Sequence, residues 1–162
     1  MDITWSDLII DIEQVDVGRL IEGWRWLMGE DKTPIMVSSI GDLFLQGTDG
    51  GVDWLNVGEG KLLRVADSFD EFQKKLQDEE QVREWFLVDL IAELKAAGHD
   101  IKERQVYSYK KLPILNGDYS VDNFEITDIE VHFSFAGQIH QQVKDLPDGT
   151  RIDNVKFIPN KV

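Results

Sequence analysis

The clearest pattern of hydrophobic and polar positions lies between Gly41 and Leu76. Three short apolar runs, at residues 43–45, 52–57 and 62–65, follow one another and are separated by glycine-rich turns. Because glycine accepts positive φ without steric cost, turns of two to five residues that contain it favour antiparallel hairpins. Together with an apolar strand at 35–40, this pattern predicts a β-meander over residues 34–67. In it, Leu43 and Leu45 face one side and Phe44 the other.

Helices are predicted over residues 69–97. Ser68-Phe69-Asp70-Glu71 has the form of a capping box, in which the serine hydroxyl accepts from the Glu71 N–H and the Glu71 carboxylate reaches back. Asp78-Glu79-Glu80 then opens a longer helix that ends at Gly98, and its first-turn carboxylates complement the helix dipole. A wide apolar stripe predicts that this longer helix is substantially buried. The stripe consists of Val82, Phe86, Leu87, Leu90, Ile91 and Leu94.

Residues 1–30 are predicted to form a helical lead-in. Thr4 can cap a first helix with Asp7 in its first turn, and Asp16 begins a second helix. In the second helix, apolar residues recur at helical spacing until Gly29.

The chain after residue 98 shows an irregular stretch, a helix and a final strand. Residues 99–122 are expected to form an irregular loop that three tyrosines hold to the surface. Apolar residues alternate between 129 and 135 as in a strand, but Thr127-Asp128-Ile129-Glu130 has the form of a capping box. The apolar positions up to Leu146 also fit one helical stripe. We predict a helix from about Asp128 to Asp145 and a closing strand at Ile152–Ile158, together occupying residues 128–158.

These elements predict one α+β domain over residues 1–162. It has a largely antiparallel sheet, an N-terminal helical lead-in and helices packed on the sheet. A chain of 162 residues with 42% hydrophobic content can bury a core without disulfides or metals. No repeat or linker divides it.

Charge narrows the classes of partner. The formal net charge is −14, so the chain repels nucleic acid phosphates and anionic lipid, and neither is predicted as a direct partner. A basic protein would be attracted instead. There is no cysteine, no signal peptide and no apolar run of the ~20 residues that a membrane span needs, so we expect a cytoplasmic protein. Nothing in the pattern specifies an oligomeric state.

Catalytic and cofactor motifs are not evident. The three histidines, His99, His132 and His140, form no HExxH or other i, i+4 ligand pair, and they are interpreted as surface or capping residues. The glycine-rich turns lack the Lys-Ser/Thr of a phosphate loop and precede strands. We therefore predict no catalytic residue, no metal and no cofactor. An enzyme that uses the 99–122 loop with His132 or His140 is the least favoured alternative.

Several motifs resemble those of a bacterial family first catalogued as a domain of unknown function. They are GQIHQQVKDLPDGTRI at Gly137–Ile152, GDLFL at Gly41–Leu45, VADSFDEFQKKL at Val65–Leu76, and Tyr107-Ser108 followed by Pro113, Leu115, Gly117 and Tyr119. The family is best known as the C-terminal domain of immunity proteins against a type VI secretion DNase effector. Its longer members carry an additional N-terminal GAD-like domain, and a more distant similarity is to the SUKH immunity superfamily. The resemblance implies a non-catalytic protein that binds a toxin and blocks its active site.

The hypothesis is thus an immunity-type protein that neutralises a cognate toxin, expected to be a basic nuclease. The alternative is a scaffold or regulatory adaptor without a toxin. Exposed acids on the helices and large aromatic side chains are the candidate contacts, since a nuclease needs a basic surface and aromatic residues dominate interface energetics. These candidates are Asp67, Asp70, Glu71, Asp78, Glu79, Glu80, Glu84, Trp26, Trp54 and Tyr109.

Overall fold

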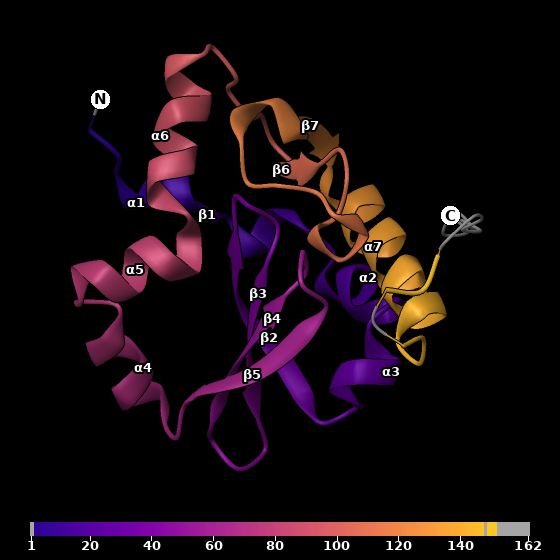
Figure 1. The fold of residues 1–162 in the computed structure, drawn as a ribbon. Coiled ribbons are helices and arrows are strands. Elements are labelled where there is room, and N and C mark those ends of the chain that lie inside the picture. Colours follow the sequence, from indigo (N-terminus) through magenta and orange to yellow (C-terminus); the bar gives the residue numbers. More distant parts are fainter. Residues whose placement is uncertain (1, 148, 152–162) are drawn as a thin grey trace.

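The computed structural model describes residues 2–147 and 149–151 and has the predicted α+β architecture (Figure 1). A five-stranded antiparallel sheet has the strand order β1-β2-β3-β4-β5, and a separate two-stranded sheet pairs β6 with β7. The strands are β1 (Ile9–Ile10), β2 (Lys32–Ser38), β3 (Leu43–Gly47), β4 (Val52–Asn56), β5 (Lys61–Ala66), β6 (Gln105–Tyr109) and β7 (Phe124–Asp128). The meander predicted from the glycine-rich turns is confirmed.

Helices cover both faces of the large sheet (Figure 1). On one side lie α4 (Phe69–Lys75), α5 (Glu79–Phe86) and α6 (Val88–Ala96), and on the other lie α2 (Val17–Glu22), α3 (Arg25–Met28) and α7 (Ile129–Val143). Phe44 on β3 faces the first group, with ring centroids 5.1 Å from Phe72 and 5.3 Å from Trp85. Because both faces are covered, Leu43, Phe44 and Leu45 are all fully buried.

The helix predicted from Asp78 to Gly98 is two helices. The first helix, α5, begins where the sequence predicted, and Asp78 is its cap, with its carboxylate accepting from the Glu80 N–H at 3.0 Å. Leu87 then adopts a left-handed backbone (φ +50°) and turns the chain between α5 and α6. This turn lets Trp85 and Phe86 pack on Phe44 while α6 runs in a different direction (Figure 1). A straight helix would not follow the twisted surface of the sheet.

The helical lead-in is also more divided than predicted. The first helix, α1 (Trp5–Leu8), is one turn long, and the chain continues into β1 and a short 3-10 helix, η1 (Ile12–Gln14). The second predicted helix is interrupted at Gly23 and Trp24, between α2 and α3. At that point Gly23 lies against Gly137 of α7: a Cβ added at Gly137 would lie 2.6 Å from the Gly23 carbonyl oxygen.

The close approach of these two glycines predicts the effect of Gly137→Ala. Helix propensity alone favours alanine by up to about 1 kcal/mol, but the added methyl would press on backbone that cannot rotate away. We expect a net loss of about 2 kcal/mol in the free energy of unfolding, measured by urea titration. Gly18→Ala, at an exposed position of α2 where the nearest atom is a side-chain oxygen at 3.3 Å, is the control. It should leave stability unchanged or raise it by up to about 1 kcal/mol through helix propensity, and equal effects of the two substitutions would contradict the packing.

Residues 99–122, predicted to be irregular, contain strand β6 and two short 3-10 helices, η2 (Pro113–Leu115) and η3 (Val121–Asn123). Tyr107 and Tyr109 are buried and only Tyr119 is exposed, so the tyrosines pack inward more than expected. The helix chosen for the ambiguous segment is confirmed as α7, and its cap is Asp128, which accepts from the Glu130 N–H at 2.9 Å. The predicted closing strand Ile152–Ile158 lies outside the described residues.

The two edges of the large sheet differ. β1 pairs with β2 over two residues only, whereas β5 forms a longer edge along β4. A group of ion pairs crosses the sheet beside β5: the buried Asp53 carboxylate binds both Lys32 of β2 and Arg64 of β5. Arg64 also contacts Asp49 at 2.8 Å. These ion pairs connect β2, β4 and β5, although β3 lies between β2 and β4 in the sheet.

Candidate partner-binding surface

The acids proposed as partner contacts lie on or beside α4 and α5, and most of them are exposed. Asp70 and Glu71 occupy the first turn of α4, and Asp78 and Glu79 begin α5. Residues 67–98 as a whole carry nine acidic and four basic side chains. The structure therefore places this group on one helical region with an excess of negative charge.

Several of these carboxylates also have local structural roles. The Ser68 hydroxyl accepts from the Glu71 N–H at 3.1 Å as predicted, while the Glu71 carboxylate lies 3.5 Å from the Lys75 ammonium. Glu79 pairs with Arg83 at 3.3 Å, one turn along the helix. Exposed pairs of this kind contribute little stability, about 0.3–0.5 kcal/mol each. The ion pairs leave the region with an excess of negative charge, since its acidic side chains outnumber its basic ones.

Two of the three aromatic residues proposed as anchors are buried, and the third is half-buried. Trp54 is 8% exposed and Tyr109 is 7% exposed, and Trp26 is half-buried. Trp54 donates its indole N–H to the Asp42 carboxylate at 3.1 Å, and Tyr109 packs on Phe124 with ring centroids 4.6 Å apart. Burial thus corrects Trp54 and Tyr109 as surface contacts.

Other aromatic residues that sequence reasoning did not propose are exposed, among them Trp5 at 43% and Phe69 at 44%. Trp5 belongs to the one-turn helix α1, and Phe69 is the first residue of α4. Trp5 packs edge-on against Phe86 of α5, with ring centroids 5.5 Å apart. Its indole N–H has no hydrogen-bond partner among the described residues.

A groove of about 630 Å³ lies where α1 meets α5 and α6, and we name it the α1 groove. Its walls are held in place by two contacts from α1: Trp5 against Phe86, and Asp7 against Lys95 of α6 at 3.2 Å. Hydrogen bonds from Thr4 and the ion pair with Lys95 hold the pKa of Asp7 below its usual value. The groove is lined by Asp2, Ile3, Thr4, Trp5, Leu8, Leu76, Gln77, Glu79, Val82, Arg83, Val88, Asp89 and Ala92.

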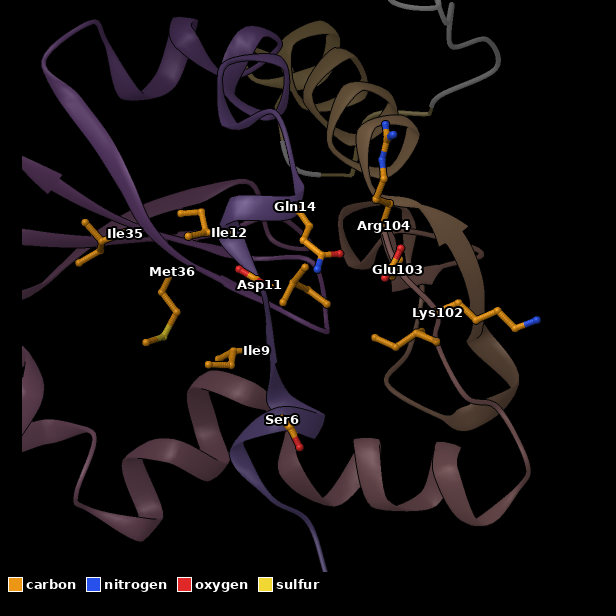
Figure 2. Close-up of a pocket in the computed structure, with 12 residues that line it drawn as sticks. Ser6, Ile9, Asp11, Ile12, Gln14, Ile35, Met36, Lys102, Glu103 and Arg104 are labelled. Atoms are coloured by element: carbon orange, nitrogen blue, oxygen red, sulfur yellow. The ribbon is translucent and has the colours of Figure 1, made fainter.

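A second groove, of about 740 Å³, lies on the other side of the N-terminal segment (Figure 2). Figure 2 shows residues of β1 and η1 on one side, β2 residues on another, and the segment 101–104 facing them. The apolar lining consists of Ile9, Ile10, Ile12, Ile35, Met36 and Ile101. Its charged residues are balanced, with Asp11 and Glu103 opposed by Lys102 and Arg104.

His132 and His140 are buried on α7 and are not surface residues as interpreted from the sequence. His132 Nε2 lies 2.8 Å from the Gly41 carbonyl oxygen and its Nδ1 lies 2.7 Å from the Ser108 hydroxyl. His140 Nε2 lies 2.8 Å from the Val57 carbonyl oxygen. Burial lowers the pKa of His132 to about 4 and also lowers that of His140. Both imidazoles connect α7 to turns of the sheet.

Asp42, which directly follows Gly41 in the chain, has a buried carboxylate. It accepts hydrogen bonds from the Val57 N–H at 2.9 Å and from Trp54, and burial raises its pKa to about 7. Buried groups with shifted pKa values occur at active sites, but they also occur in structural networks. Here each described partner is a backbone group or a core side chain. Among residues 2–147 and 149–151, no group of three or more potential ligands is placed to hold a metal ion.

The protein is thus an α+β protein of net negative charge with two grooves beside its N-terminal segment. Within the described ranges, no helix is long and apolar enough to cross a membrane. Residues 66–140 match the family model described as the C-terminal region of the type VI secretion immunity protein Tdi1. The resemblance inferred from the sequence motifs is thereby confirmed for the segment that contains α4–α6, β6, β7 and most of α7.

Other comparisons give the fold little further support. No curated protein matches the chain. A crystal structure of Atu4351 from Agrobacterium tumefaciens aligns with 75% of this chain at 15% identity and a TM-score of 0.46. The chain spans 63% of that protein.

Proposed function

We propose that this protein is a non-catalytic immunity protein that binds a cognate bacterial toxin in the cytoplasm and neutralises it, and that the toxin is a nuclease. The observation that carries the proposal is the match of residues 66–140 to a type VI secretion immunity family. The acids proposed as contacts, from Asp67 to Glu84, all lie inside that segment. An acidic surface on this segment complements the basic surface with which a nuclease binds phosphate groups.

Charge explains how such a protein would act. A nuclease needs a basic surface to hold nucleic acid, so a chain of net charge −14 would be steered toward it and compete for the same surface. The inhibition needs no chemistry from this chain. The buried, hydrogen-bonded state of His132 and His140 also favours a structural role over the enzyme alternative.

The proposal is tested by capture of the product of the adjacent gene with the tagged chain, at about 0.05 M and about 0.5 M salt. We expect a one-to-one complex that weakens at the higher salt, together with loss of the captured protein's nuclease activity on plasmid DNA. The chain alone should leave the plasmid intact. Capture without inhibition would favour the adaptor alternative, and absence of capture at both salt concentrations would contradict toxin binding.

A further inference from the structure

We infer that the α1 groove is the docking site for a cationic segment of the toxin that has an apolar face. This inference rests on the proposed function and adds to it the place and the chemistry of contact. Apolar residues of α1, α5 and α6 line the groove, and Leu76, Val82 and Val88 are among its apolar residues. These three side chains are only partly buried, so the groove offers apolar surface to a partner.

Trp5 gives the groove an anchor. Its side chain is 43% exposed and its indole N–H lacks a partner among the described residues, although the ring is fixed against Phe86. A fixed, amphipathic ring at the edge of a partly apolar groove has the properties of an interface hot spot. A partner can cover the exposed face of the ring and accept from its N–H in one contact.

The charged side chains that line the groove, here called its rim, determine which kind of segment can bind there. Asp2, Glu79 and Asp89 line the groove, and Arg83 is the single basic residue that lines it. Arg83 lies between Glu79 at 3.3 Å and Asp89 at 4.0 Å, so two carboxylates share one guanidinium and the rim keeps a net negative charge. Lysine or arginine side chains beside apolar ones complement this rim, whereas nucleic acid phosphates and anionic lipid are repelled.

Contacts within the protein also order the walls of the groove in the absence of a partner. The Asp7–Lys95 ion pair joins α1 to α6 at 3.2 Å, and the hydrogen bond from the Thr4 N–H to the Asp7 carboxylate (2.9 Å) closes the turn of α1. A wall that is already ordered reduces the entropic cost of binding. The larger groove in Figure 2 has balanced charge and therefore selects no such partner.

The test measures the dissociation constant of the toxin complex for two pairs of variants. Asp2→Lys/Asp89→Lys reverses charge at the groove, and Glu13→Lys/Glu125→Lys makes the same change in net charge at exposed positions on η1 and β7. Trp5→Ala removes the anchor, and Phe135→Ala removes an exposed aromatic of α7, a helix that lies on the other side of the large sheet from α5 and α6 (Figure 1). We expect each groove variant to weaken binding about tenfold or more, and each control to weaken it less than about threefold.

Two further measurements separate the possible outcomes. Urea unfolding of each variant distinguishes loss of docking from loss of fold, because Trp5 also packs on Phe86. A helical peptide with leucine at i, i+3, i+4 and i+7 and lysine elsewhere is a probe that does not require the toxin, with glutamate replacing lysine in the control peptide. The lysine peptide should bind the native chain and should bind the folded groove variants at least about fivefold more weakly than the control variants.

If folded groove variants bind and neutralise the toxin like the native chain, the docking inference is overturned and the proposed function stands. If the native chain binds the lysine peptide at the groove but captures no toxin, the groove chemistry is supported and the proposed function fails. Equal binding of the peptide to groove and control variants would show attraction to the whole acidic surface and would overturn the inference.

Discussion

Gly41→Ala is expected to lower the free energy of unfolding by about 3 kcal/mol or more. Gly41 has a φ of +81°, which costs a residue with a Cβ about 1–2 kcal/mol. A Cβ there would also lie 2.1 Å from His132 Nε2, the atom that is hydrogen-bonded to the Gly41 carbonyl. The substitution therefore adds a buried clash and a broken hydrogen bond to the backbone cost.

Gly50→Ala is the matched control, because Gly50 has a φ of +85° but nothing lies within 4 Å of its hypothetical Cβ. Its free energy of unfolding should fall only by the cost of a positive φ for a residue with a Cβ, about 1–2 kcal/mol. The measurement is urea unfolding of both variants at pH 7.5, followed by tryptophan fluorescence. Equal losses would mean that His132 does not pack against the turn at Gly41.

The second large effect is a pair of opposite pH dependences. Burial lowers the pKa of His132 from 6.5 to about 4, so the unfolded chain binds more protons between these values. The histidine contribution to stability is therefore complete above pH 6.5 and is lost as the pH falls to about 4. Burial raises the pKa of Asp42 from 3.8 to about 7, so its contribution is complete below pH 3.8 and is lost as the pH rises to about 7.

At about 1.4 kcal/mol per pKa unit, the His132 contribution amounts to about 3–4 kcal/mol and the Asp42 contribution to about 4–5 kcal/mol. We expect them nearly to cancel in the native chain between pH 4 and 6.5. In Asp42→Asn the histidine contribution remains, so stability should rise by about 3 kcal/mol across that range, with His140 adding in the same direction. Urea unfolding at half-unit steps of pH provides the slopes, and a flat profile in Asp42→Asn would contradict the histidine assignment.

Sequence reasoning succeeded where the determinants are local. The turns of the meander, the cap at Ser68, the helix start at Asp78 and the choice of a helix after Asp128 all depend on neighbouring residues in the chain. The breaks at Gly23 and Leu87 depend on packing between distant segments, and no local pattern marks them. Strand β6 was missed because its pairing partner, β7, lies fifteen or more residues further along the chain.

For the candidate surface too, some residues could be placed from the sequence and others could not. Charged residues at helix starts are exposed in most proteins, so the acids of α4 and α5 could be placed from the sequence. The exposure of a tryptophan depends on its neighbours in space: Trp54 has an acceptor in buried Asp42, whereas Trp5 lies on a single helical turn at the edge of the fold. The residue type is the same at both positions, so only the fold distinguishes the exposed tryptophan from the buried one.

The ion group beside β5 has a consequence for how copies of the protein behave toward one another. An open edge strand presents unpaired backbone groups to which another strand can add, and charged side chains on that strand oppose the addition. On β5, Lys61 and Arg64 supply this protection, and the carboxylates of Asp49 and Asp53 hold the Arg64 guanidinium in place. At the opposite edge, β1 is too short to template a second sheet. Both edges of the large sheet therefore carry features that oppose the edge-to-edge association of copies of the protein.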